Sequence, residues 1–261
     1  MSTVHATTDT AAPGRAKRPS LGRLTAMELR KMTDTRAGAW LLAIVTLIAV
    51  GMVVLQLFTG DGGGRTFAGV FAGTLMPVSI LLPVLGILSV TSEWSQRTVV
   101  TTFTLVPVRW RTTAAKLLAG AVLAAMSVVV CLAVAAAGNL LVGPFVDGDG
   151  GWAIEPVAIG NAFVAQLISV LMGMAFGMLF MSTPLAIVLY FLLPAVWATL
   201  GRFVDALATA REWLDQSVTL AALTTGEMTG ESWAKVAATA GVWLLLPLAA
   251  GLVRLMRREV S

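Results

Sequence analysis

The sequence contains few of the side chains that usually carry out chemistry. Its 261 residues include a single cysteine, Cys131, and a single histidine, His5. A disulfide within the chain is therefore excluded, and metal sites built from Cys and His lack their ligands. Ser-His-Asp and Cys-His catalysis lack their usual base, because His5 lies in a polar tail. We expect no metal, no cofactor and no catalytic residue in this chain, and we do not expect it to be an enzyme.

Charged residues are also scarce. Only 12% of the residues are charged, whereas 57% are apolar and the mean hydropathy is +0.85. Soluble domains carry about 25% charged residues, so the composition predicts a membrane protein. The isoelectric point near 9.8 is high, but the basic residues flank apolar segments. That pattern follows the positive-inside rule and does not indicate a nucleic-acid surface. We expect a lipid membrane and no nucleic acid as partner.

Long apolar runs dominate the remainder of the chain. A helix needs about 20 apolar residues to cross the hydrocarbon core. We predict an all-α integral membrane protein whose six-span domain covers residues 37–258, with transmembrane helices at about 37–58, 67–91, 117–142, 157–181, 184–200 and 236–253. Residues 1–20 are rich in Thr, Ala and Pro and are expected to form a disordered tail.

The distribution of basic residues predicts the orientation. With the N-terminus in the cytoplasm, 14 Lys and Arg residues lie inside and 4 lie outside. This bias places both termini in the cytoplasm and makes the chain a multi-pass protein of the inner (plasma) membrane. Abundant alanine and an excess of arginine over lysine indicate a bacterial source.

Four polar side chains and four glycines lie within or next to the predicted spans. Buried amides need hydrogen-bond partners, so they either line a substrate path or join helices, and we favour helix joining: Gln56, Asn139, Asn161 and Gln166. The glycines form two GxxxG pairs that allow close helix packing: Gly69, Gly73, Gly173 and Gly177. No span holds an ionisable side chain in its interior, which argues against a proton- or ion-coupled carrier. Energy for transport would then come from elsewhere.

Three segments outside the spans could carry function. The pattern of residues 21–36 predicts a basic amphipathic helix on the membrane surface that carries Glu28, Arg30 and Lys31. The alternative is a frayed approach to the first span. Residues 92–116 predict a short helix that begins after a cap at position 91 or 92 and ends before Pro107. This stretch is either a solvated turn or a docking surface for a cytoplasmic partner. The external loop 201–235 predicts a re-entrant or interfacial helix, or a simple surface helix.

Nothing in the sequence predicts a nucleotide site in this chain. Residues 60–66, Gly-Asp-Gly-Gly-Gly-Arg-Thr, lack the lysine and the preceding strand of a P-loop. The charged stretch instead reads Ser92-Glu93-Trp94-Ser95-Gln96-Arg97-Thr98, followed by Pro107-Val108 and Lys116-Leu117, and Glu28-Leu29-Arg30-Lys31 precedes the first span. In these motifs and in its layout over about residues 20–258, the chain resembles the permease subunit of a type-2 ATP-binding-cassette (ABC) transporter. Members of that family often have Gly where this chain has Arg97.

The resemblance implies a mechanism. Residues 92–106 would form a coupling helix that docks in a groove of a separate ATPase subunit, which binds ATP and Mg. The contact would use Glu93, Trp94, Gln96, Arg97, Thr98, Phe103 and Arg109, braced by the helix 21–36. Two such permease chains, as a homodimer or with a related chain, would form the membrane path of an exporter, and the external loop would act as its gate. The alternative is a structural or regulatory subunit without its own path. A membrane-embedded enzyme would need paired acids or a nucleophile with a base, which the spans do not supply.

Overall fold

The structure is a computed structural model, and it describes residues 20–59, 66–95, 109–142, 151–225 and 228–257. Almost all of these residues are helical, and there is no strand among them. The helices are α1 (Leu21–Asp34), α2 (Arg36–Thr59), α3 (Phe67–Ser95), α5 (Arg109–Val142), α6 (Pro156–Phe180), α7 (Thr183–Phe203), η1 (Asp205–Leu207), α8 (Ala208–Leu214), α9 (Gln216–Thr225), α10 (Gly230–Ala240), the π-helical η2 (Gly241–Leu245) and α11 (Leu246–Arg257).

Within the described residues, six stretches are long and apolar enough to cross a membrane, as predicted. They are Arg36–Gln56, Phe67–Ser92, Trp110–Leu141, Pro156–Phe180, Thr183–Phe203 and Gly230–Arg254. Two of them extend beyond the expected bounds. The third begins at position 110, in the first turn of α5, rather than at 117, and the sixth begins at position 230 and runs through η2 into α11. Apolar runs stop at charged residues, whereas the hydrogen bonds of a helix continue through them.

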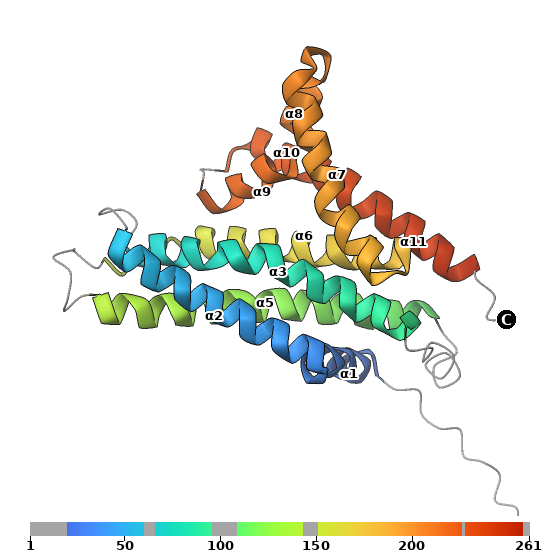
Figure 1. Ribbon diagram of the computed structural model, residues 1–261, viewed down its shortest axis with the longest axis horizontal. Coiled ribbons are helices and arrows are strands. Elements are labelled where there is room, and N and C mark those ends of the chain that lie inside the picture. Colours follow the sequence, from blue (N-terminus) through green and yellow to red (C-terminus); the bar gives the residue numbers. More distant parts are fainter. Residues whose placement is uncertain (1–19, 60–65, 96–108, 143–150, 226–227, 258–261) are drawn as a thin grey trace, which may run out of the picture.

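Helices α3 and α6 form the centre of the molecule, with α2, α5 and α11 packed around them (Figure 1). Close approach of α3 and α6 depends on glycine on both sides. A Cβ at Gly173 would lie 2.3 Å from the carbonyl oxygen of Pro83, and one at Gly86 would lie 2.7 Å from that of Val170. The Gly173 position therefore has the packing contact that the GxxxG pattern predicts. At Gly177 the approach of α3 is less close, because a Cβ there would lie 3.2 Å from the carbonyl oxygen of Ile87.

The end of α3 differs from the sequence prediction. Positions 91 and 92 do not cap a new helix, because α3 continues to Ser95. The hydroxyl of Thr91 donates to Ile87 O or shares a 2.7 Å hydrogen bond with Thr183 Oγ1 at the start of α7. This residue thus joins α3 to α7. The predicted coupling helix falls mostly on residues 96–108, which lie outside the described residues.

A tight turn of two residues, Met181 and Ser182, links α6 to α7. Met181 adopts a left-handed conformation with φ of 53°, and its N–H donates to Gly177 O. Arg254 of α11 donates to Leu179 O at 2.6 Å and so covers one carbonyl at the end of α6. From this turn α7 rises away from the central helices and carries α8 at its far end (Figure 1).

The predicted external loop is largely helical. Asp215 precedes α9 and accepts hydrogen bonds from the N–H and hydroxyl of Ser217, which is how an N-cap residue acts. Trp243 Nε1 donates to Leu214 O at 2.8 Å, and Thr239 donates to Trp213 O at 2.9 Å. These contacts hold α8 against α10 and η2, and the hydrogen bond that Thr219 donates to Thr239 at 3.1 Å holds α9 against α10, so this region packs as a unit onto the sixth span.

Candidate functional site

A buried charged cluster joins three helices at one end of the molecule. Lys116 of α5 donates to Glu28 Oε2 of α1 at 2.5 Å and to Ser89 O of α3 at 2.9 Å. Lys31 of α1 donates to Glu28 Oε1 at 2.7 Å. The Glu28 and Lys116 side chains are each only 10% exposed. We call Glu28, Lys116, Lys31 and Ser89 the charged node.

The local sequence explains why the node forms. Ser20 caps α1 by accepting from Arg23 N, and Glu28 lies one helical turn from both Leu24 and Met32 on the buried side of α1. On α5, fully buried alanines precede and follow Lys116 at positions 115 and 119. Small side chains allow α1 to approach α5 closely, and the long lysine side chain then reaches both partners.

The ionisation of Glu28 depends on this arrangement. Burial raises the pKa of the Glu28 carboxyl, but the charge of Lys116 and hydrogen bonds from Lys116 and Lys31 outweigh it, so the pKa lies below its ordinary value. Glu28 is therefore ionised at neutral pH. A buried ion pair adds little net stability, but loss of one member leaves an uncompensated buried charge.

Several residues predicted to form the docking surface lie in the membrane-spanning helices instead of a loop. Lys116 is not in a loop: it lies in the third turn of α5, a helix of 34 residues. Glu93 and Trp94 lie in the last turn of α3, and Arg109 begins α5, while Gln96, Arg97, Thr98 and Phe103 lie outside the described residues. Arg30 is exposed and pairs with Asp34 at 2.9 Å. Sequence reasoning missed the pairing of Glu28 with Lys116; its one signal was an acid on the apolar face of an amphipathic helix.

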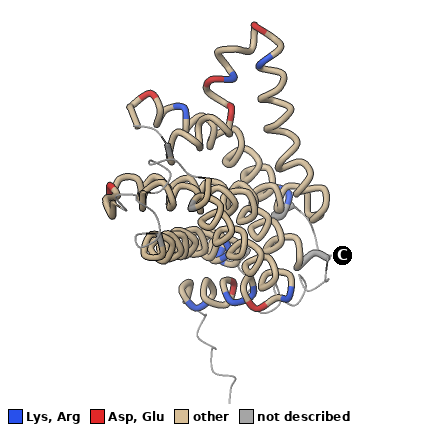
Figure 2. The backbone as a smooth tube through the Cα atoms, turned by 60° about the vertical axis from the view of Figure 1, so that its left-hand side comes forward, with Lys and Arg blue, Asp and Glu red and all other residues tan. Residues whose placement is uncertain are grey.

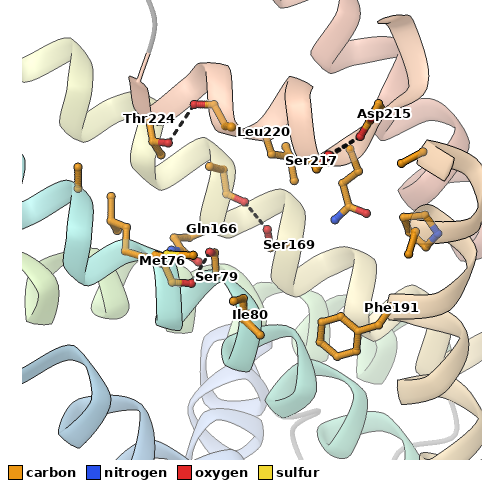
Figure 3. A pocket seen from close by; sticks show the side chains of 18 of the residues that line it. Met76, Ser79, Ile80, Gln166, Ser169, Phe191, Asp215, Ser217, Leu220 and Thr224 are labelled. Atoms are coloured by element: carbon orange, nitrogen blue, oxygen red, sulfur yellow. Dashed lines mark hydrogen bonds between the residues drawn. The ribbon is translucent and has the colours of Figure 1, made fainter. Parts of the chain in front are cut away.

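A cavity of about 900 Å³ lies away from the charged node, between α2, α3, α6, α7 and α9 (Figure 3). Its wall on α3 spans positions 72–80 and includes Met76. Met76 and Ser89 are thirteen residues apart, so the cavity and the charged node are roughly 20 Å apart along α3 at 1.5 Å rise per residue. Figure 3 shows Gln166, Phe191 and Leu220 reaching the cavity from three different helices.

Two of the four predicted polar groups line this cavity. Gln56 Nε2 donates to Gly69 O at 3.4 Å, and Gln166 Nε2 donates to Leu75 O at 3.5 Å. These amides therefore join α2 and α6 to α3, and other parts of the same two residues line the cavity. Asn139 and Asn161 are buried elsewhere and are not among the cavity residues.

The first GxxxG pair, Gly69 and Gly73, contacts the side chain of Gln56. A Cβ at Gly73 would lie 2.2 Å from Gln56 Nε2, so the amide of Gln56 rests on the glycine surface. The carbonyl of Gly69 accepts from the same amide. These two glycines thus accommodate a polar side chain from α2 at the edge of the cavity.

No group of three or more His, Cys, Asp or Glu side chains that could hold a metal occurs among the described residues. Comparison with models of known protein families and with curated proteins finds no match.

Proposed function

We propose that this chain is the permease subunit of an ATP-driven exporter of the ABC type. In this proposal a separate ATPase subunit docks on residues 92–106, and two permease chains together enclose the membrane path. The observation that carries the proposal is the charged node. It fastens the surface helix α1 to α3 and α5, the two helices that lead into and out of residues 96–108.

A coupling mechanism needs a rigid link between the docking segment and the membrane helices, and the charged node provides one between α1, α3 and α5. A force applied to the segment between α3 and α5 acts on both helices, and Lys116 bonds to α1 and α3 at once. Packed helices linked by buried ion pairs move as units rather than deform, so displacement would pass along α3 toward the cavity. The node thus supports rigid transmission over roughly 20 Å.

The charge distribution agrees with this use. Figure 2 shows charged positions along α1 at one side and along α8 to α10 at the other, with an almost uncharged body between them. Among the residues that line the cavity, two are charged: Arg202 at the end of α7 and Asp215 just before α9. Such a body suits cargo that is not moved by exchange of protons or ions, and energy would enter from a partner.

The alternative function is a structural or regulatory subunit of a transport complex, without a path of its own. The cavity favours a path, because its volume falls within the 300–1,000 Å³ that is usual for small-molecule sites.

Affinity purification of the tagged full-length chain from its native membranes in mild detergent tests the proposal. We expect an ATP-hydrolysing subunit to co-purify, and Glu93→Lys to reduce its recovery by inverting a charge at the expected contact. Glu155→Lys is the matched control, since Glu155 is exposed at the opposite end, before α6. Absence of any ATPase subunit, or equal recovery with both variants, would refute the docking surface.

A further inference from the structure

We propose that the cavity binds an anionic amphiphile from the membrane, a molecule with an apolar chain and a phosphate- or carboxylate-type head. The chain would lie between α3, α6 and α7, and the head would bind Arg202. This inference rests on the proposed function only where it makes the molecule the cargo of an exporter. The binding site itself follows from the wall of the cavity and from the charges at one end of it.

The length of the cavity suits one lipid chain. Its wall on α7 runs from Tyr190 to Arg202, so it extends over roughly 18 Å at 1.5 Å rise per residue. The hydrocarbon core of a bilayer is about 30 Å thick, which leaves about 15 Å for the chains of one leaflet. Tyr190 is buried and Arg202 is exposed, so the cavity reaches from the interior of the spans to the surface of the molecule.

The side of the cavity between α3 and α7 is apolar and accessible. Met76 and Ile80 of α3 line the cavity and are 62% and 47% exposed, and Phe191 of α7 is exposed as well. Figure 3 shows Phe191 reaching from α7 toward Ile80. Exposed apolar side chains on membrane-spanning helices face hydrocarbon. A lipid chain can therefore enter sideways from the leaflet, and its apolar surface need not cross water on the way.

Arg202 provides a site for the head at the exposed end. It lies in the last turn of α7, lines the cavity, and makes no hydrogen bond or ion pair within the part of the chain that the structure describes. The planar guanidinium donates two parallel hydrogen bonds to a phosphate or a carboxylate. Because Arg202 is exposed, the head would remain in contact with water, and no charge would need to be buried.

The acid in the wall does not offset this preference. Asp215 is only 2% exposed, accepts hydrogen bonds from the N–H and hydroxyl of Ser217, and pairs with Arg211 at 3.4 Å. Its charge is therefore compensated within the protein, and a cationic head would find no available carboxylate there. Arg202 is the uncompensated charge among the residues that line the cavity, so the head is expected to be anionic.

Photolabelling of the full-length chain in nanodiscs of zwitterionic lipid tests this inference. The probes are a long-chain alkyl phosphate with a diazirine in its chain and the trimethylammonium compound with the same chain. We expect the phosphate to label peptides from α3 and α7 at the cavity about fivefold more than the ammonium compound, the effect of one exposed ion pair at the upper end of its usual range. The exposed face of α2 around Leu47 should be labelled equally by both. Equal labelling at the cavity, or more labelling by the ammonium compound, overturns the proposal.

Variants at the exposed end locate the head. Arg202→Gln should abolish the preference for the phosphate, and Arg202→Lys should retain part of it, because the charge remains. Lys235→Gln is the matched control, since Lys235 pairs with Glu231 in α10 and is not among the cavity residues. Thermal unfolding verifies that each variant is folded, which the exposed position of Arg202 favours. A preference that persists in Arg202→Gln contradicts the assignment of the head.

A larger side chain in the wall locates the apolar chain. Ala198 lies in α7 one turn before Arg202 and lines the cavity. Ala198→Phe should reduce labelling of the cavity by both probes, because the ring takes the space of the chain, and Ala195→Phe in the same wall replaces it if that variant does not fold. Unchanged labelling in the folded variant would show that the chain does not lie there.

A competitor without a chain separates an amphiphile from a free anion. Ethyl phosphate at the concentration of the probe should leave the labelling unchanged, and displacement by it would assign Arg202 to a soluble anion and overturn the proposal. The ATPase is tested separately. If the phosphate probe binds as expected but no ATPase subunit co-purifies with the chain, the site stands and the exporter proposal fails. If an ATPase co-purifies but the two probes label equally, the exporter proposal stands and the ligand class is wrong.

Discussion

Replacement of Lys116 by methionine isolates the contribution of the charged node. Lys116→Met keeps a long apolar side chain in the same space but removes the cation that lies 2.5 Å from Glu28. Removing one partner of a buried pair typically costs about 3–5 kcal/mol, because the other charge stays buried. Lys31 still bonds to Glu28 but is half-exposed, so we expect a loss of about 2–4 kcal/mol.

The pH dependence of this loss has a definite sign. In the wild type the folded-state pKa of Glu28 lies below its ordinary value, so its stabilisation is present above the unfolded-state pKa and is lost as pH falls through the folded-state pKa. Without Lys116, two of the causes that lower the pKa of Glu28 are gone, so we expect its folded-state pKa to lie above the wild-type value. The stability gap between variant and wild type should then narrow as pH falls.

Unfolding in detergent at pH 7 and at mildly acidic pH measures the difference in unfolding free energy between Lys116→Met and the wild type. The double variant Glu28→Gln with Lys116→Met removes both charges and should recover most of the loss. Arg30→Met is the control, since the Arg30–Asp34 pair is exposed and its loss should cost less than about 1 kcal/mol. A Lys116→Met protein as stable as the wild type, or a double variant no better than the single, would refute the reasoning.

Three further substitutions test other contacts. Gly173→Ala should destabilise the protein by about 1–3 kcal/mol, because its Cβ would lie 2.3 Å from Pro83 O; Gly160→Ala, with nothing within 4 Å, should not, and equal unfolding temperatures would contradict the close helix contact. Gln166→Leu should leave stability unchanged or raise it by about 1 kcal/mol in the absence of ligand, since it removes an unpartnered buried oxygen; a large loss of stability would contradict this. Thr91→Val should cost about 1 kcal/mol by removing the hydroxyl link from α3 to α7, and an unchanged denaturation midpoint would show that the link is not stabilising.

The sequence predicted the features that depend on local composition. Six apolar runs and the amphipathic helix before the first span follow from hydropathy and periodicity, and the structure has both. Helix ends were less predictable. Charges at positions 109–116 and 231–235 interrupt the apolar runs, but helical hydrogen bonding continues through them because Lys116 finds a buried partner and Lys235 pairs with Glu231.

The candidate sites depend on contacts between distant residues, which a single sequence does not contain. Glu28 and Lys116 are 88 positions apart, and Gln166 meets Leu75 O from 91 positions away. The sequence marked Gln166 as a buried amide in need of a partner, but two roles were left open for it. The structure places it between helices and at the cavity together, and only the arrangement of α3, α6 and α7 makes that visible.

ATP hydrolysis by the affinity-purified complex tests the central claim most directly. If the chain is a permease energised through residues 92–106, ATPase activity should be recovered with the wild-type chain and with Glu155→Lys, and should fall several-fold with Glu93→Lys. Purified chain without ATP hydrolysis, or activity equal in all three preparations, would contradict the account.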